Sequence, residues 1–142
     1  MNSIPGRLIG IDVGEKRVGL ARTDPMQMFP SAIGTFDPKG SLERISDECA
    51  SEQVAGFVVG WPQRDENSPS DAMKMVDRFI KKLEGRFPGI PVYKVDEYLS
   101  SQEAMQVMIQ SGVPRHKRRE KGRLDQVAAS LILERYLQSR RC

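Results

Sequence analysis

The chain has 142 residues, of which 39% are hydrophobic and 29% are charged, with a formal net charge of +3. This length and composition predict one globular domain over residues 1–142, with enough apolar residues to bury a core. They exclude a membrane-spanning protein, because no apolar run approaches the roughly 20 residues that a spanning helix needs. They also exclude a disulfide framework, since Cys49 and Cys142 are the only cysteines. The N-terminus lacks a secretory signal pattern, so we expect a cytoplasmic protein.

The first predicted element is a β-hairpin over 7–21 that carries one acid, Asp12, inside an apolar strand. Apolar and β-branched residues flank a polar turn with the sequence GEKR. Because side chains alternate along a strand, Asp12 shares a face with Gly10, which we expect to leave space there for a ligand. The alternative interpretation of Asp12 is a strand-end acid that caps the turn or pairs with Lys16 or Arg17.

The following elements complete a meander and then alternate between helix and strand. A third strand is predicted over 30–36, directly after the hairpin. The spacing of apolar residues predicts, in chain order, a helix over 41–53 that Ser41 caps, a buried central strand over 54–60, an amphipathic helix over 71–87, a strand over 90–96, a helix from Ser100 to Gly112 and an apolar helix over 124–137. This order predicts an α/β fold: a five-stranded mixed sheet, three strands in an antiparallel meander and two parallel, flanked by helices.

Three acids fall at the ends of three different predicted elements. Asp12 nearly ends the first strand, Glu97 follows the last strand, and Asp125 enters the last helix on its apolar side. An acid at a helix N-terminus also complements the helix dipole, which gives Asp125 a purely structural alternative. Three converging carboxylates favour metal-assisted phosphodiester hydrolysis with two Mg²⁺ or Mn²⁺ ions, and Asp96 is a possible fourth ligand. Zinc is disfavoured, because His116 is the only histidine.

A basic run over 115–123, RHKRREKGR, lies just before Asp125 and contains a single acid. We expect this run to hold a phosphate backbone against the acids, whereas the alternative is an ordinary solvated loop. Aromatic residues make up only 6% of the chain, which favours recognition of backbone charge and shape over base stacking. The candidate nucleic-acid contacts are Lys16, Arg17, Arg115, Lys117, Arg118, Arg119, Lys121 and Arg123.

Four motifs together resemble the YqgF family, which is also called RuvX. They are IGIDVGEKRVGLA over 9–21, VVGWP over 58–62, VDEYLSSQEA over 95–104 and GRLDQVAASLILERYL over 122–137. The resemblance implies a ribonuclease H-like nuclease domain whose acidic triad falls on Asp12, Glu97 and Asp125. The family is described as Holliday-junction resolvases, or as nucleases that mature the 5′ end of 16S ribosomal RNA in bacteria.

The chain departs from the family pattern at two places, and both concern substrate contacts. Tyr98 stands where the family usually has an arginine, and the loop over 63–70 lacks the usual glycine. We expect maturation of precursor 16S ribosomal RNA, with resolution of Holliday junctions by a homodimer as the alternative. A non-catalytic nucleic-acid-binding protein is the rival from another class. An ATP-binding module like those of actin-like ATPases is disfavoured, because these close a cleft between two such domains.

Overall fold

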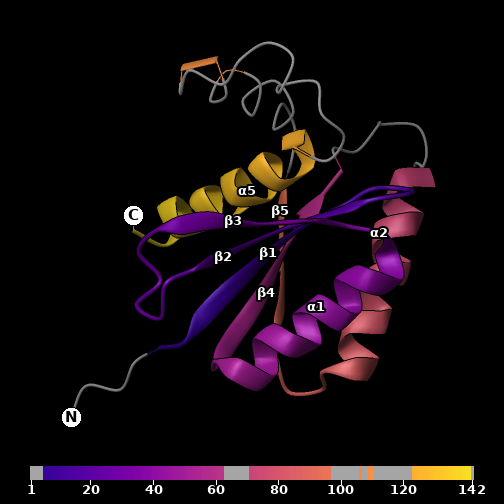
Figure 1. Ribbon diagram of the computed structural model, residues 1–142, viewed down its shortest axis with the longest axis horizontal. Coiled ribbons are helices and arrows are strands. Elements are labelled where there is room, and N and C mark those ends of the chain that lie inside the picture. Colours follow the sequence, from indigo (N-terminus) through magenta and orange to yellow (C-terminus); the bar gives the residue numbers. More distant parts are fainter. Residues whose placement is uncertain (1–4, 63–70, 97–105, 107–108, 111–122, 142) are drawn as a thin grey trace.

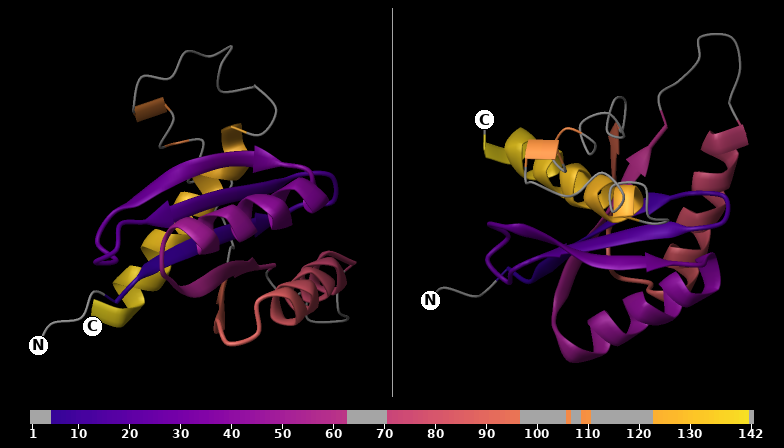
Figure 2. Two further views of the ribbon diagram at one scale, coloured as in Figure 1. Left: turned by 60° about the horizontal axis from the view of Figure 1, so that its bottom comes forward. Right: turned by 45° about the horizontal axis from the view of Figure 1, so that its top comes forward.

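The computed structural model describes residues 5–62, 71–96, 106, 109–110 and 123–141. In these residues a five-stranded sheet carries α1 and α2 on one face and α5 on the other (Figures 1 and 2). The loop over 63–70 lies outside the described residues. So does most of the predicted helix from Ser100 to Gly112. The elements are β1 (Arg7–Val13), β2 (Val18–Thr23), β3 (Pro30–Phe36), α1 (Pro38–Ser51), β4 (Val54–Trp61), α2 (Asp71–Arg86), β5 (Val92–Asp96) and α5 (Arg123–Arg141).

The order of the strands in the sheet is β3-β2-β1-β4-β5. β1, β2 and β3 form the antiparallel meander, β4 runs parallel to β1, and β5 runs parallel to β4. The mixed sheet predicted from the sequence is therefore confirmed. β1, β4 and β5 end at the same side of the sheet, which we call the carboxyl edge. None of the described helices combines the length and apolar character that a bilayer crossing requires.

Helix α1 begins at Pro38 and not at Ser41, so the predicted start of this helix was wrong. Asp37 is the N-cap, and its side chain accepts a hydrogen bond from the Gly40 N–H at 3.2 Å. Pro38 then occupies the first turn, where the missing N–H of proline costs no hydrogen bond. Ser41 lies one turn further along and is buried, and its Oγ donates to the Pro38 carbonyl at 2.6 Å. An aspartate directly before a proline was thus the stronger start signal.

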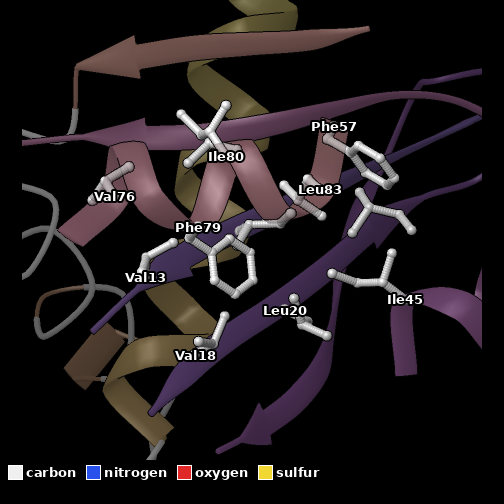
Figure 3. Packing of buried hydrophobic residues seen from close by; sticks show 12 residues of the cluster. Val13, Val18, Leu20, Ile45, Phe57, Val76, Phe79, Ile80 and Leu83 are labelled. Carbon is white, nitrogen blue, oxygen red and sulfur yellow. The ribbon is translucent and has the colours of Figure 1, made fainter. Parts of the chain in front are cut away.

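The larger core lies between the sheet and the two helices α1 and α2 (Figure 3). Alternate residues of β1, namely Ile9, Ile11 and Val13, point to this face, as the alternation of side chains along a strand requires. The apolar side of α2 packs against these residues, which explains the amphipathic pattern predicted for this helix. The buried α2 residues are Val76, Phe79, Ile80 and Leu83.

A second core lies on the opposite face, where α5 packs on the sheet. It contains Leu8, Ala21 and Val58 from the strands, and Ala129, Ile132, Leu133 and Leu137 from α5. Helix α5 lies directly over Gly10, because a Cβ atom at Gly10 would lie 2.6 Å from Leu133 Cγ and 2.7 Å from the Ala129 carbonyl oxygen. The expectation that Gly10 leaves space for a ligand was therefore wrong. Gly10 allows the helix to approach the sheet closely.

The buried carboxylate of Glu48 connects α1 to β2. Its side chain is 6% exposed and pairs with Arg22 Nη1 at 2.6 Å and with Arg44 Nε at 3.2 Å.

We expect Glu48→Ala to lower the free energy of unfolding by about 2 kcal/mol, because it leaves two guanidinium groups without this partner. Urea denaturation measures the loss. The matched control is Asp77→Ala, which removes an exposed carboxylate 3.2 Å from Lys81 Nζ and should cost less than about 0.5 kcal/mol. Equal losses in the two variants would contradict this role for Glu48.

Candidate active site

Asp12 lies at the carboxyl edge with a glycine on each neighbouring strand. It is half-buried, and it points to the α5 face because the preceding Ile11 packs on the opposite one. On β2 its direct partner is Gly19. On β4 the register pairs Ile11 with Val59, which places Asp12 level with Gly60. Neither neighbouring strand therefore puts a side chain beside Asp12 on this face.

The first turn of α5 lies against Gly19. A Cβ atom there would overlap the carbonyl carbon and oxygen of Asp125, so the absence of a side chain lets the helix start in this position. Directly opposed residues of antiparallel strands have Cα atoms about 4.5–5.5 Å apart. Asp125 is thereby brought next to Asp12, and its side chain remains 29% exposed. The backbones of two of the three predicted acids thus lie close together, although the two residues are far apart in the sequence.

A tight turn between β1 and β2 supplies the basic side of this place. The Gly14 N–H donates to the Arg17 carbonyl at 2.8 Å, and a Cβ atom at Gly14 would lie 2.7 Å from that same oxygen. This turn requires glycine at its first position. Arg17 Nε in turn donates to Asp125 Oδ2 at 3.2 Å. Lys16 and Arg17 line a cavity of about 240 Å³ together with Asp125, Gly14 and Glu15.

Asp96 ends β5 and is exposed, and the alternation of that strand turns it away from Asp12. Val95 packs with the residues under α5, whereas Val92 packs with the core under α1 and α2. Asp96 is in alternation with Val92 and so belongs to the α1 and α2 face. The structure therefore brings Asp12 and Asp125 together without Asp96. Glu97 lies outside the described residues.

Most of the predicted basic contacts also lie outside the described residues. These are Arg115, Lys117, Arg118, Arg119 and Lys121, with His116 among them, while Arg123 begins α5 and its side chain is not described. Within the part of the chain that the structure describes, no group of three acidic, cysteine or histidine side chains is close enough to hold a metal ion. The described part of the site thus comprises Asp12, Asp125 and the turn between β1 and β2, whose Glu15, Lys16 and Arg17 line the cavity with Asp125.

Sequence reasoning missed the two glycines beside Asp12 and the partner of Arg17. The Gly19 position could have been found, because a turn over 14–17 that joins Val13 to Val18 places Asp12 opposite Gly19. The position of Gly60 beside Asp12 depends on the register between β1 and β4, which the sequence pattern does not give. No local signal indicates the contact between Arg17 and Asp125, whose positions are 108 residues apart.

The sheet order, with α5 across the face that carries Asp12, defines the ribonuclease H-like class of α/β folds. A solved structure titled "T. thermophilus RuvC in complex with Holliday junction substrate" has a similar fold. The TM-score is 0.51 at 14% sequence identity, covering 94% of this chain and 95% of that one. At this identity the likeness is one of fold alone. The predicted ribonuclease H-like fold is confirmed.

The chain belongs to the RuvX family, whose model, described as Holliday junction resolvase, matches residues 6–139. Relatives named "Putative pre-16S rRNA nuclease" agree with this assignment. The protein of Chlorobium luteolum is 45% identical over 96% of both chains, and that of Chlorobaculum tepidum is 44% identical over 94% of both. The protein of Porphyromonas gingivalis is 38% identical over 93% of this chain and 96% of its own. The predicted family is confirmed, and it is a family of nucleases.

Proposed function

We propose that this chain is a metal-dependent nuclease of the cytoplasm that processes the 5′ end of precursor 16S ribosomal RNA. The observation that carries the proposal is the close approach of the Asp125 backbone to Gly19, the direct strand partner of Asp12, at the carboxyl edge. The names of the relatives support ribosomal RNA as the substrate. The reaction is hydrolysis of a phosphodiester bond.

The donor set suits Mg²⁺ or Mn²⁺, because carboxylate oxygens are the ligands that these hard cations prefer. Asp12, Asp125 and Glu97 would hold two ions, while the position of Asp96 on the other face argues against it as a ligand. Bound ions would activate the attacking water and stabilise the leaving oxygen. Asp12 contributes a fixed position, since it belongs to a strand that is hydrogen-bonded on both sides.

The other residues of the site serve to hold the nucleic-acid backbone. Lys16 and Arg17 line the cavity beside Asp125 and carry the positive charge that phosphate oxygens need. The basic run over 115–123 would extend this contact along the strand, with Arg115, Lys117, Arg118, Arg119, Lys121 and Arg123 as its members. Gly60 leaves no side chain beside Asp12 on β4, whereas Gly19 admits the first turn of α5.

A side-by-side cleavage assay tests the proposal. A labelled precursor of 16S ribosomal RNA and a four-way DNA junction are each incubated with purified protein and Mn²⁺ or Mg²⁺. We expect cleavage of the RNA at its 5′ side, and none when EDTA removes the metal. Cleavage that persists in EDTA would contradict the metal requirement. Binding of the RNA without cleavage under any metal condition would favour the non-catalytic nucleic-acid-binding protein.

Resolution of Holliday junctions is the second candidate function, and the description of the family model favours it. A resolvase makes two symmetric cuts, so this function calls for a homodimer with two sites. Cleavage of the junction but not of the RNA, by a protein whose mass in light scattering is that of a dimer, would replace the first proposal with this one. A monomer that cuts RNA alone would remove the second candidate.

A further inference from the structure

Arg17 is paired with an acid that the proposed function assigns to a metal ion. Its Nε lies 3.2 Å from Asp125 Oδ2. The pair is partly open to solvent, since the side chain of Arg17 is 45% exposed and that of Asp125 is 29% exposed. A guanidinium N–H and a divalent cation compete for the same carboxylate oxygen. A metal ion that binds Asp125 through Oδ2 therefore requires Arg17 to weaken or leave this contact.

We propose that Arg17 is a placeholder cation, which neutralises Asp125 before the metal binds and contacts a phosphate of the nucleic acid after it is displaced. This inference rests on the proposed function, because it takes Asp125 to be a metal ligand. It adds a coupling between the binding of metal and the binding of nucleic acid. Arg17 acts on metal binding indirectly, through Asp125, and binds the substrate directly.

The contact is weak enough to be exchanged. Ion pairs that are open to solvent change an equilibrium constant by only about one- to fivefold. A divalent cation carries twice the charge of the guanidinium and so competes favourably for Asp125. In the absence of metal the pair is favourable, because the positive charge of Arg17 reduces the repulsion between the carboxylates of Asp12 and Asp125. The ion pair thus fits a temporary role better than a structural one.

The turn keeps Arg17 at the site after it leaves Asp125. Its backbone is fixed by the hydrogen bond from the Gly14 N–H to the Arg17 carbonyl, at 2.8 Å. Only the side chain is free to move, and it borders the cavity that Lys16 and Asp125 also line. Guanidinium groups bind phosphate through two parallel hydrogen bonds. A displaced Arg17 is therefore in reach of a nucleic-acid strand that passes the metal site.

This arrangement couples metal binding to substrate binding. Arg17 opposes the metal while it is paired with Asp125, and a phosphate that binds Arg17 removes this opposition. By thermodynamic reciprocity, metal then increases the affinity for nucleic acid by the same factor. The free enzyme is predicted to bind metal weakly, and the complex with nucleic acid to bind it more tightly.

The first test measures Mn²⁺ binding without nucleic acid, by the electron paramagnetic resonance signal of free Mn²⁺. We expect Arg17→Gln to bind Mn²⁺ about three- to fivefold more tightly than the wild type, because the competing cation is gone. Lys16→Gln is the matched control, since it removes one positive charge from the same turn and leaves the ion pair intact. It should change the affinity by about twofold or less. Arg17→Lys, which retains the charge, should stay close to the wild type.

The second test measures coupling through the fluorescence anisotropy of a labelled RNA hairpin with cleavage-resistant phosphorothioate linkages. Wild-type protein should bind this hairpin more tightly in Mn²⁺ than in EDTA. Arg17→Gln should lose a larger part of this gain than Lys16→Gln, because Arg17 carries the coupling and Lys16 contributes charge alone. Equal loss in the two variants would overturn the coupling.

The outcomes separate this inference from the proposed function. Wild-type protein that binds no Mn²⁺ would contradict the metal-dependent nuclease itself. Wild-type protein that binds Mn²⁺, together with equal affinities in Arg17→Gln and Lys16→Gln, would overturn the placeholder role and leave the nuclease standing. Circular dichroism melting of each variant shows whether it is folded, and a misfolded Arg17→Gln is replaced by Arg17→Met in the same comparison.

Discussion

Replacing Asp12 with asparagine is expected to abolish detectable cleavage, a loss of about a thousandfold or more. The amide has nearly the shape of the carboxylate but lacks its charge, so it holds a divalent cation poorly. Asp12 lies between Gly19 and Gly60 on the adjoining strands, which leaves no neighbouring side chain on these strands to take over its role. The measurement is the single-turnover rate on precursor 16S ribosomal RNA in saturating Mn²⁺.

The control for this prediction is Asp77→Asn, which makes the same chemical change on the exposed surface of α2. It should cleave at the wild-type rate. A second measurement separates lost metal binding from lost folding: Mn²⁺ should raise the melting temperature of the wild type and of Asp77→Asn, but raise that of Asp12→Asn much less. Wild-type cleavage by a folded Asp12→Asn would rule out Asp12 as a catalytic ligand.

The strands were predictable because their signals are local. Alternation placed Asp12 on the face opposite Ile11, and the run over 54–60 was apolar enough to require cover on both faces. The start of α1 was also encoded locally, by Asp37 and Pro38, but Ser41 offered a competing cap. Such errors are confined to element ends, where several polar residues can each satisfy the first N–H groups of a helix.

Contacts between distant segments were harder to predict, and Gly10 shows why. Alternation determines which face a residue occupies, but it does not say which element covers that face. At Gly10 the cover is Leu133 and Ala129 of α5, which the sequence separates from it by most of the chain. The same reason hides the ion pair between Arg17 and Asp125. The acids could be recognised as candidates one by one, whereas their surroundings depend on how α5 packs.

The packing of α5 and the geometry of the candidate site both depend on Gly19. We expect Gly19→Ala to lower the free energy of unfolding by about 3 kcal/mol, because the added methyl group overlaps the backbone of Asp125 and no side-chain rotation relieves this. Its backbone conformation does not require glycine, so the effect is steric alone. Urea denaturation followed by circular dichroism measures the loss.

The same substitution should impair catalysis in the molecules that remain folded. To accommodate the methyl group, the first turn of α5 must move away from β2 and carry Asp125 away from Asp12. A displacement of about 1 Å at a catalytic group can cost on the order of a hundredfold in rate. The matched control is Gly85→Ala in α2, where a Cβ atom meets nothing within 4 Å and alanine should stabilise the helix by up to about 1 kcal/mol. If Gly19→Ala were as stable and as active as Gly85→Ala, the close approach of α5 to β2 would not be what positions Asp125.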